Sequence, residues 1–435
     1  MVIEDFFTNE TLGLNDKTWE LIFKDFNILE AVKQGIYDID AETIKKYRRE
    51  PRLMAKYDSK DELPVVMRKN KLSILPYKNR GHYAIGYFDV FTKVKNDPLL
   101  RGRKVINDLN LDTLDPFKIH KEPSMILAAY NYNIINNITE SDYLITNFGR
   151  ESTVEFDYMI NNLKGGRYDI HVGKSQIEID GVFESDDSVI IVEGKMGDKT
   201  EFVTRQLYYP YRLLKQQTDK DIYVVFMNYS SGSIFAHTYQ FTDMNNYNSL
   251  KMIKTERYDF YEDLSVSDIS SIIIDAKIES EPDIPFPQAD SMFRVFDALE
   301  LIYLKNGINN GVIGEEMSLT GRQGHYYGQA CQYLGLVAKG NGYQITQIGK
   351  EILIRNQGTK NQLMIKQMAK HKIFNYFMKE YLEQSRPPTI SEIIEFMKND
   401  PELSKRMPGD TTKKRRAQTV LSWINWAFSI AAADN

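Results

Sequence analysis

The chain has 435 residues, of which 42% are hydrophobic and 26% are charged, as is usual for soluble globular proteins. This length predicts two to four domains with ample core. The single cysteine, Cys331, excludes an internal disulfide. No apolar run is as long as a membrane span, and the start Met1–Asp5 lacks the basic residues of a signal peptide. We therefore expect a cytoplasmic protein with no membrane partner.

The net charge of −5 is distributed unevenly along the chain. Residues 286–435 hold 19 Lys and Arg against 14 Asp and Glu, a net charge of +5, which leaves −10 for residues 1–285. An acidic front half joined to a basic back half is compatible with a cleavage module fused to a DNA reader.

The first two segments of the chain differ in character. Residues 1–54 are predicted to form an N-terminal helical region, and its three short helices fit either a helix-turn-helix or a plain helical cap. Residues 55–281 are predicted to form an α/β (α+β) domain with a β-rich lead-in. Its strand candidates are residues 64–67, 72–76 and 83–88.

Two helices are predicted ahead of the central motif of that domain. The first is an apolar segment rich in Ala and Ile that runs from Glu122 to Asn137. The second begins at Gly149, because Val154, Tyr158 and Leu163 recur at helical spacing and define one buried face.

The central motif is a strand–turn–strand unit. Residues Gln176–Gly181 alternate apolar and polar side chains, the period of a strand with one apolar face, and Val189–Val192 is the β-branched run of a buried strand. Glu193 and Lys195 directly extend that run and point to the same side of the strand, and Asp180 can lie beside Glu193 across the turn. Two carboxylates and an ammonium that converge in this way suit a divalent metal and an attacking water. The alternative is a surface hairpin whose charges are merely solvated.

This pattern resembles the PD-(D/E)xK nuclease superfamily, whose signature is an acid on one strand followed by an acid-x-lysine on the next. The matching positions are Asp180, Glu193 and Lys195, and Ile179 stands where a proline often precedes the first acid. The resemblance spans residues 120–245 and implies a mixed sheet flanked by helices. It also implies that Asp180 and Glu193 hold Mg²⁺ and that Lys195 acts on the attacking water.

Related nucleases often add an acid on the helix before the catalytic hairpin and a polar side chain on the helix after it. Glu151 and Glu155 lie four residues apart on the helix predicted from Gly149, and Glu151 is preferred for its place in the first turn. On the helix predicted over residues 200–217, Gln206 is expected to hold the attacking water or a phosphate oxygen.

Residues 282–288, which contain three prolines, are predicted to form a linker. Residues 289–356 resemble a winged helix-turn-helix, with a short helix, a turn, a polar helix and a two-stranded wing. Arg322, Gln323 and Tyr326 lie on the polar helix, the expected reader of DNA, because Arg and Gln pair bidentately with guanine and adenine edges.

Residues 357–435 are predicted to form a second helical, winged-helix-like region that binds DNA. Its last predicted helix starts at Asp410 and carries a polar and basic set near its N-terminus: Lys413, Lys414, Arg415, Arg416 and Gln418. Helix N-termini favour acids, so a cationic start indicates a phosphate partner. A solvated basic patch is the alternative.

As a whole, the chain resembles a Type II restriction endonuclease that cuts double-stranded DNA with Mg²⁺. Cutting both strands of a duplex needs two such sites or two turns, so a homodimer is expected, at least on DNA. A cognate methyltransferase is the expected genetic partner. Two alternatives remain open. One is a non-enzymatic winged-helix transcription regulator, and the other is a repair or mobile-element nuclease of the same fold.

Overall fold

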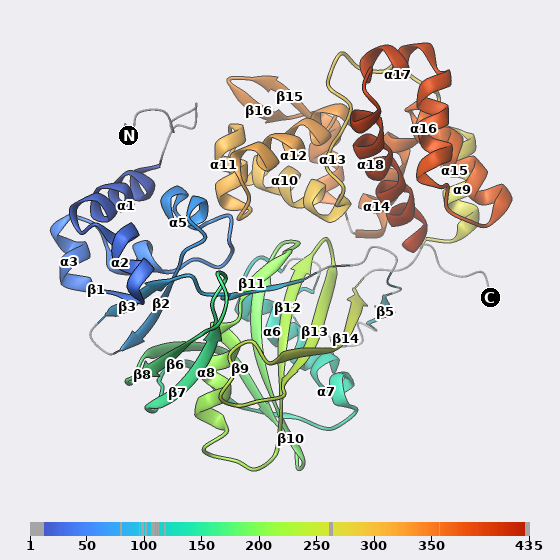
Figure 1. The fold of residues 1–435 in the computed structure, drawn as a ribbon. Coiled ribbons are helices and arrows are strands. Elements are labelled where there is room, and N and C mark those ends of the chain that lie inside the picture. Colours follow the sequence, from blue (N-terminus) through green and yellow to red (C-terminus); the bar gives the residue numbers. More distant parts are fainter. Residues whose placement is uncertain are drawn as a thin grey trace.

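The structure is a computed structural model that describes residues 13–430 except 79–80, 95, 97–99, 101, 106–108, 110, 112, 117–118, 261–263 and 356. Buried apolar side chains gather into four clusters, two of which lie on opposite faces of one sheet. We therefore divide the chain into three packing units: the N-terminal unit (residues 14–87), the sheet unit (88–260) and the C-terminal unit (264–430). Figure 1 shows the N-terminal unit (blue) and the C-terminal unit (yellow to red) above the sheet unit.

The N-terminal unit packs five short helices against a three-stranded antiparallel sheet of order β1-β3-β2. Its elements are α1 (Leu14–Asp25), α2 (Ile28–Gln34), β1 (Tyr37–Asp40), α3 (Ala41–Lys46), α4 (Pro51–Ala55), α5 (Val65–Lys69), β2 (Ser73–Lys78) and β3 (His82–Gly86). Residues 64–67, expected as a strand, instead begin helix α5, since so short an apolar run does not distinguish the two states. The buried cluster continues from Trp19 to Tyr87, past the domain boundary expected at residue 54.

The sheet unit is built on a seven-stranded mixed sheet of order β5-β14-β13-β12-β10-β9-β6. Its strands are β5 (Arg103–Lys104), β6 (Leu144–Ser152), β9 (Gln176–Glu184), β10 (Ser188–Met196), β12 (Asp221–Ser230), β13 (Ser233–Phe241) and β14 (Leu250–Asp259). Two further pairs join β4 (Phe91–Lys93) to β11 (Glu201–Val203) and β7 (Phe156–Asn161) to β8 (Arg167–Val172). The expected mixed sheet flanked by helices is therefore present.

Helices cover both faces of this sheet, which explains the continuous apolar run in β10. Ile191 belongs to the cluster that contains α8 (Arg205–Leu214). Ile190 belongs to the cluster that contains α6 (Glu122–Asn131) and α7 (Ile134–Thr139). A strand covered on both faces buries every side chain, and β-branched residues suit that environment.

The prediction of a helix from Gly149 is wrong, because residues 144–152 form strand β6 and residues 156–161 form strand β7. In β7, Phe156, Tyr158 and Ile160 are all buried, which is an alternation with period 2. The helix prediction required Leu163 on the buried face, but its side chain is 46% exposed. Strand pairing with β9 and β8 thus overrode the helical spacing.

The C-terminal unit is helical apart from one hairpin. Its elements are α9 (Val266–Ile274), α10 (Met292–Leu304), α11 (Asn310–Glu316), α12 (Gly321–Tyr333), β15 (Val337–Gly340), β16 (Gly342–Ile345), α13 (Gln347–Ile354), α14 (Gln357–Ala369), α15 (Lys372–Gln384), α16 (Ile390–Asn399), α17 (Pro401–Arg406) and α18 (Asp410–Ser429). From α10 to β16 the order is three helices followed by a two-stranded hairpin, which is the order expected for residues 289–356.

The proline-rich segment 282–288 is packed against the C-terminal unit instead of forming a free linker. The Phe286 side chain is buried, and its ring centroid lies 5.4 Å from that of Tyr333 and 6.3 Å from that of Phe374. Arg406 also donates a hydrogen bond to the carbonyl of Pro282. The aromatic residue among the prolines is what fixes this segment.

Helix α10 attaches the C-terminal unit to the segment that follows β10. The Arg294 Nε donates to the Asp198 carbonyl at 2.8 Å, and the Asp198 N–H donates to Asp297 Oδ2 at 2.9 Å. The ring of Phe293 packs edge-on against Phe235 of β13. Among the described residues, no helix is long and apolar enough to cross a membrane.

Candidate active site

An acidic cluster surrounds the end of strand β10. Strands β9 and β10 pair antiparallel with Val192 opposite Gly181, so Asp180 and Glu193 are the next residues along the two strands. The Asp180 Oδ2 accepts a hydrogen bond from the Gly194 N–H at 2.9 Å. The strand–turn–strand unit therefore brings the two acids together as expected.

Glu193 is the most enclosed acid of this cluster, with 3% of its surface exposed. Its Oε1 accepts a hydrogen bond from Lys195 Nζ at 2.6 Å and another from Gln206 Nε2 on α8. The structure thus brings together Asp180, Glu193, Lys195 and Gln206. A buried carboxylate needs such donors, since its desolvation is otherwise costly.

Two further carboxylates approach Lys195 from other parts of the chain. Glu122, the first residue of α6, places Oε1 at 3.8 Å from Lys195 Nζ. Asp58, between α4 and α5 of the N-terminal unit, places Oδ2 at 3.6 Å from the same atom. The ammonium of Lys195 therefore lies among three carboxylates from three separate segments.

The charges and the burial shift the pKa values of these groups. Burial raises the pKa of Glu193 above its ordinary value, although the Lys195 charge lowers it, and the Asp180 charge raises it further. Burial also raises the pKa of Glu122. For Lys195, burial alone would lower the pKa, but the three neighbouring carboxylates outweigh it and raise the pKa well above the ordinary value. Lys195 is therefore held as an ammonium.

The oxygen atoms of the cluster suit a hard cation such as Mg²⁺. In the described part of the chain, no group of three or more His, Cys, Asp and Glu side chains is already arranged around one cation position. Two buried acceptors at the cluster, Asp58 Oδ1 and Gln206 Oε1, have no hydrogen-bond partner. The donor set thus fits Mg²⁺ in its chemistry, and a cation there would take over the charge compensation that Lys195 now provides to Glu193.

Glu151 does not belong to this cluster. It lies on strand β6, exposed, opposite Ile177 of β9, and its carboxylate accepts a hydrogen bond from Asn147. The acid on the preceding helix is instead Glu122. The sequence did hold a signal for it, because the apolar helix predicted from residue 122 starts with an acid.

Glycine at the middle of the Glu193-Gly194-Lys195 motif lets helix α6 come close to β10. A Cβ atom at Gly194 would lie 2.6 Å from Met125 Cε and 3.2 Å from Ile126 Cδ1. This close approach brings the first turn of α6, and with it Glu122, beside Lys195.

We predict that Glu122→Gln and Glu151→Gln differ sharply in any activity that depends on this cluster. Glu122→Gln removes a charge beside Lys195 and should lower the rate by about 10–100-fold, the usual cost of losing a supporting group. Glu151→Gln changes only an exposed strand residue and should match the wild type. Initial rates of both variants, measured in parallel, test this, and equal rates would exclude Glu122 from the site.

The expected DNA-reading residues lie at the start of α12. Arg322 is exposed, and its Nε donates to the Tyr326 hydroxyl at 2.7 Å. Gln323 caps the helix, since its Oε1 accepts from the Thr320 N–H at 2.9 Å. Arg322 and Tyr326 are thus available at the surface as a pair. The side-chain oxygen of Gln323, in contrast, already accepts a hydrogen bond from Thr320.

The basic start of α18 is divided between core and surface. Lys413 is buried, which corrects its expected place on a phosphate-binding surface. It belongs to the buried face with Ala417, Val420 and Ile424, which recurs at helical spacing. Lys414, Arg415 and Gln418 are exposed, and Arg416 is half-buried with one hydrogen bond of 2.7 Å to Gln288.

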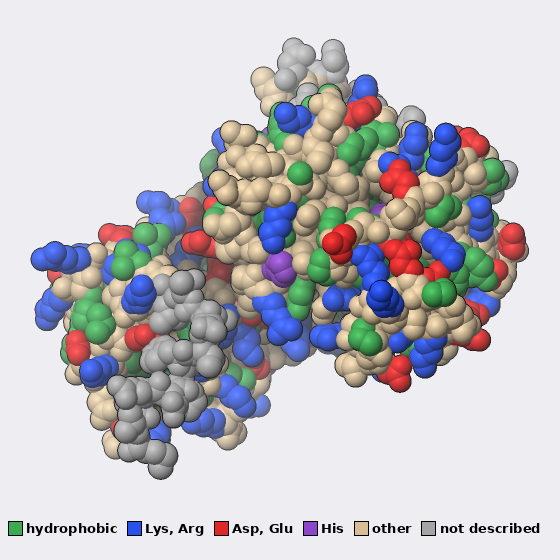
Figure 2. Space-filling view, turned by 90° about the horizontal axis from the view of Figure 1, so that it is seen from above, with side chains coloured by type: hydrophobic (Ala, Val, Ile, Leu, Met, Phe, Trp, Pro, Cys, Tyr) green, Lys and Arg blue, Asp and Glu red, His purple; other side chains and the backbone are tan. Residues whose placement is uncertain are grey.

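Figure 2 shows a hollow between the N-terminal and C-terminal units. Lys and Arg side chains lie on both of its sides, and acidic side chains lie within it. A strongly charged partner could therefore meet basic side chains from both units on this face.

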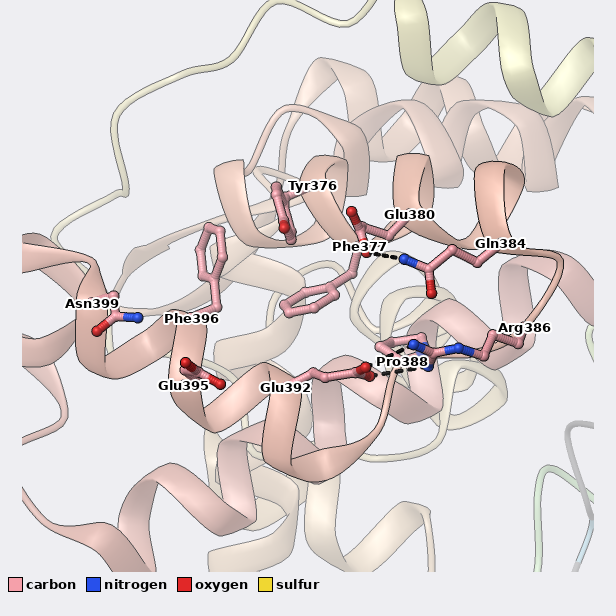
Figure 3. A pocket seen from close by; sticks show the side chains of 10 residues that line it. All are labelled: Tyr376, Phe377, Glu380, Gln384, Arg386, Pro388, Glu392, Glu395, Phe396 and Asn399. Carbon is pink, nitrogen blue, oxygen red and sulfur yellow. Dashed lines mark hydrogen bonds and ion pairs between the residues drawn. The ribbon is translucent and has the colours of Figure 1, made fainter.

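A separate pocket of ≈ 280 Å³ lies between α15 and α16, and Figure 3 shows its lining residues. Its carboxylates are largely paired within the pocket, Glu392 with Arg386 at 2.7 Å and Glu380 with Gln384 at 2.5 Å. No residue of the acidic cluster lines it. The pocket therefore takes no part in the candidate active site.

Three family models match the chain, and each is described as a domain of unknown function. DUF6996 matches residues 16–85, DUF6997 matches residues 86–259, and DUF7226 matches residues 294–432. No curated protein and no solved structure matches the chain. The three matched segments correspond closely to the three packing units, and the acidic cluster combines residues from the first two.

Proposed function

We propose that the chain is a Mg²⁺-dependent endonuclease of the PD-(D/E)xK superfamily that cuts double-stranded DNA. The observation that carries this proposal is the convergence of Asp180, Glu193 and Lys195 at the end of the β9–β10 hairpin. Glu122 from the preceding helix and Gln206 from the following helix join them. Two acids, a lysine and flanking polar groups at one place can hold a divalent cation and an attacking water for phosphodiester hydrolysis.

Asp180 and Glu193 would hold the cation, with Glu122 beside them. A Mg²⁺ ion there would supply Lewis-acid activation of the scissile phosphate and the attacking water. Gln206 fixes Glu193 by its side-chain N–H and keeps its own oxygen free to accept a hydrogen bond from that water. The protein groups thus orient the reactants in an enclosed site.

Lys195 would act as a cation and not as a general base. The surrounding carboxylates raise its pKa above the ordinary value, which favours the protonated ammonium. A fixed ammonium can orient the attacking water and neutralise the charge that develops on the phosphate in the transition state.

The C-terminal unit supports DNA as the substrate. The helix order of α10 to α12 with the β15–β16 hairpin is that of a winged helix-turn-helix, and Arg322 is exposed at the start of the reader helix. We further propose a Type II restriction enzyme that cuts as a homodimer and has a methyltransferase as genetic partner. A regulator without activity would have no use for a buried Glu193–Lys195 pair beside Asp180.

Incubation of the purified full chain with unmethylated phage DNA and Mg²⁺ tests this proposal. Discrete fragments that share one sequence at or near their ends are expected. Uncut DNA under all divalent ions, together with specific binding to a duplex, would favour the regulator instead.

We predict that the exposed basic residues at the start of α18 bind phosphates. Changing Lys414 and Arg415 to Ala should weaken binding to all duplexes and reduce the slope of log K against log salt by about one unit per lost contact. Lys413→Met is the matched control, because the buried neighbour should leave this slope unchanged. Titrations at two salt concentrations measure it, and an unchanged slope in the double variant would remove α18 from the DNA interface.

A further inference from the structure

The loop between α4 and α5 carries Asp58 into the acidic cluster and is fixed at several points. The Tyr57 hydroxyl accepts a hydrogen bond from Trp19 Nε1 at 3.0 Å and donates one to the Met54 carbonyl at 2.7 Å. The Asp58 N–H donates to Glu62 Oε2 at 2.8 Å. These bonds set the position of Asp58 from within the N-terminal unit.

Contacts with the sheet unit hold the same loop against the site. Arg52 of α4 pairs with Glu178 of β9 at 3.0 Å. The Lys60 N–H donates to the Glu201 carboxylate of β11. The two contacts flank Asp58 in sequence, and they join it to the strand of Asp180 and to the segment that leads from Lys195 into α8.

Asp58 differs from Glu193 and Glu122, the other two acids around Lys195, in the contacts that its carboxylate makes. Glu193 already shares one oxygen between Lys195 and Gln206, and it is a proposed metal ligand together with Asp180. Glu122 lies beside them. Asp58 comes from another unit, its Oδ2 faces Lys195 at 3.6 Å, and its buried Oδ1 has no partner.

We propose that Asp58 is a positioning residue for Lys195, and that the N-terminal unit therefore supplies part of the active site. This inference rests on the proposed nuclease function. If Glu193 held a cation, its attraction for the Lys195 ammonium would weaken, and Asp58 would keep the ammonium directed at the reacting phosphate. The N-terminal unit is then required for catalysis and not only for contact with DNA.

The test compares Asp58→Asn with Asp61→Asn in the full chain. Asp61 lies on the same loop, and its backbone carbonyl, not its carboxylate, accepts a hydrogen bond from Arg68. Asp58→Asn should lower the single-turnover rate constant on a cleavable duplex by about 10–100-fold, whereas Asp61→Asn should match the wild type. The affinities of Asp58→Asn for duplex DNA and for Ca²⁺ should stay within about threefold of wild type, since the carboxylate acts on the lysine.

Asp58→Glu, which keeps the charge, should recover a large part of the lost rate, and thermal unfolding of all variants shows whether they fold. A wild-type rate in Asp58→Asn would overturn the inference while the nuclease proposal stands. Loss of Ca²⁺ binding in Asp58→Asn as complete as in Glu193→Gln would also overturn it, since Asp58 would then be a metal ligand.

If the wild-type chain cuts no DNA, the nuclease proposal fails. A second measurement then still tests whether Asp58 acts on Lys195. In that case urea unfolding of Asp58→Asn, Lys195→Met and the double variant measures the coupling between the two side chains. Additive effects on the free energy of unfolding would show that Asp58 does not act on Lys195.

Discussion

Lys195→Ala should abolish DNA cleavage, a loss of at least about 100-fold, and leave the affinity for duplex DNA within a few-fold. The ammonium acts on the attacking water and on the charge of the transition state, whereas affinity comes mainly from contacts elsewhere. The buried ion pair with Glu193 at 2.6 Å holds the Lys195 ammonium at this place. Single-turnover cleavage and a binding titration in Ca²⁺ measure the two quantities separately.

Lys174→Ala serves as the matched control for this prediction. Lys174 is exposed on the turn between β8 and β9 and belongs to the same sheet unit. It should cut DNA at the wild-type rate. Undiminished cutting by Lys195→Ala would remove the lysine from the catalytic site.

Asp180→Asn and Glu193→Gln should each lose Mg²⁺-dependent cleavage because the cation is no longer held. Glu193→Gln keeps the size of the side chain but leaves Lys195 without its closest carboxylate. DNA binding should persist, since each change removes a negative charge beside the phosphates. Cleavage and DNA affinity as functions of Mg²⁺ concentration measure both effects.

Asp186→Asn provides the control within the same hairpin, because Asp186 is exposed at the turn between β9 and β10. It should require the same Mg²⁺ concentration as the wild type. Full activity in either Asp180→Asn or Glu193→Gln would show that this hairpin is not the active site.

The hairpin was predictable because its signals are local. Alternation in β9, the β-branched run of β10 and the turn between them fix the pairing, and the pairing places Asp180 beside Glu193. Gln206 was also predictable, since it lies in the first turn of the helix that follows. Period and spacing along the chain carry this information.

Glu151 was wrongly placed because one set of apolar residues fits two periods. Val154, Tyr158 and Leu163 fit a helix, yet Phe156, Tyr158 and Ile160 fit a strand, and pairing with neighbouring strands decides between them. Strand stability depends on partners that are distant in sequence, so local spacing is a weaker guide there. The acid at the start of the earlier helix, Glu122, is the one that approaches Lys195.

Asp58 and Lys413 show two other limits of the sequence. Asp58 reaches the site from another packing unit, 137 residues before Lys195, and nothing in its local sequence indicates that contact. Lys413 was grouped with its basic neighbours, although the helical face of Ala417 and Val420 includes it. Grouping the basic residues by their order along the chain placed Lys413 on the surface. Grouping them by helical period would have placed it on the buried face.

The chemical nature of the DNA ends tests the central claim most directly. A 5′-labelled duplex is incubated with the full chain in Mg²⁺, in EDTA, and in EDTA followed by excess Mg²⁺, and the end groups of the products are analysed. Metal-assisted hydrolysis at the Glu193–Lys195 site predicts 5′-phosphate and 3′-hydroxyl ends in Mg²⁺, no product in EDTA, and recovery when Mg²⁺ is restored. Cleavage that persists in EDTA, or 3′-phosphate ends, would contradict the assignment of this cluster as a metal-dependent nuclease site.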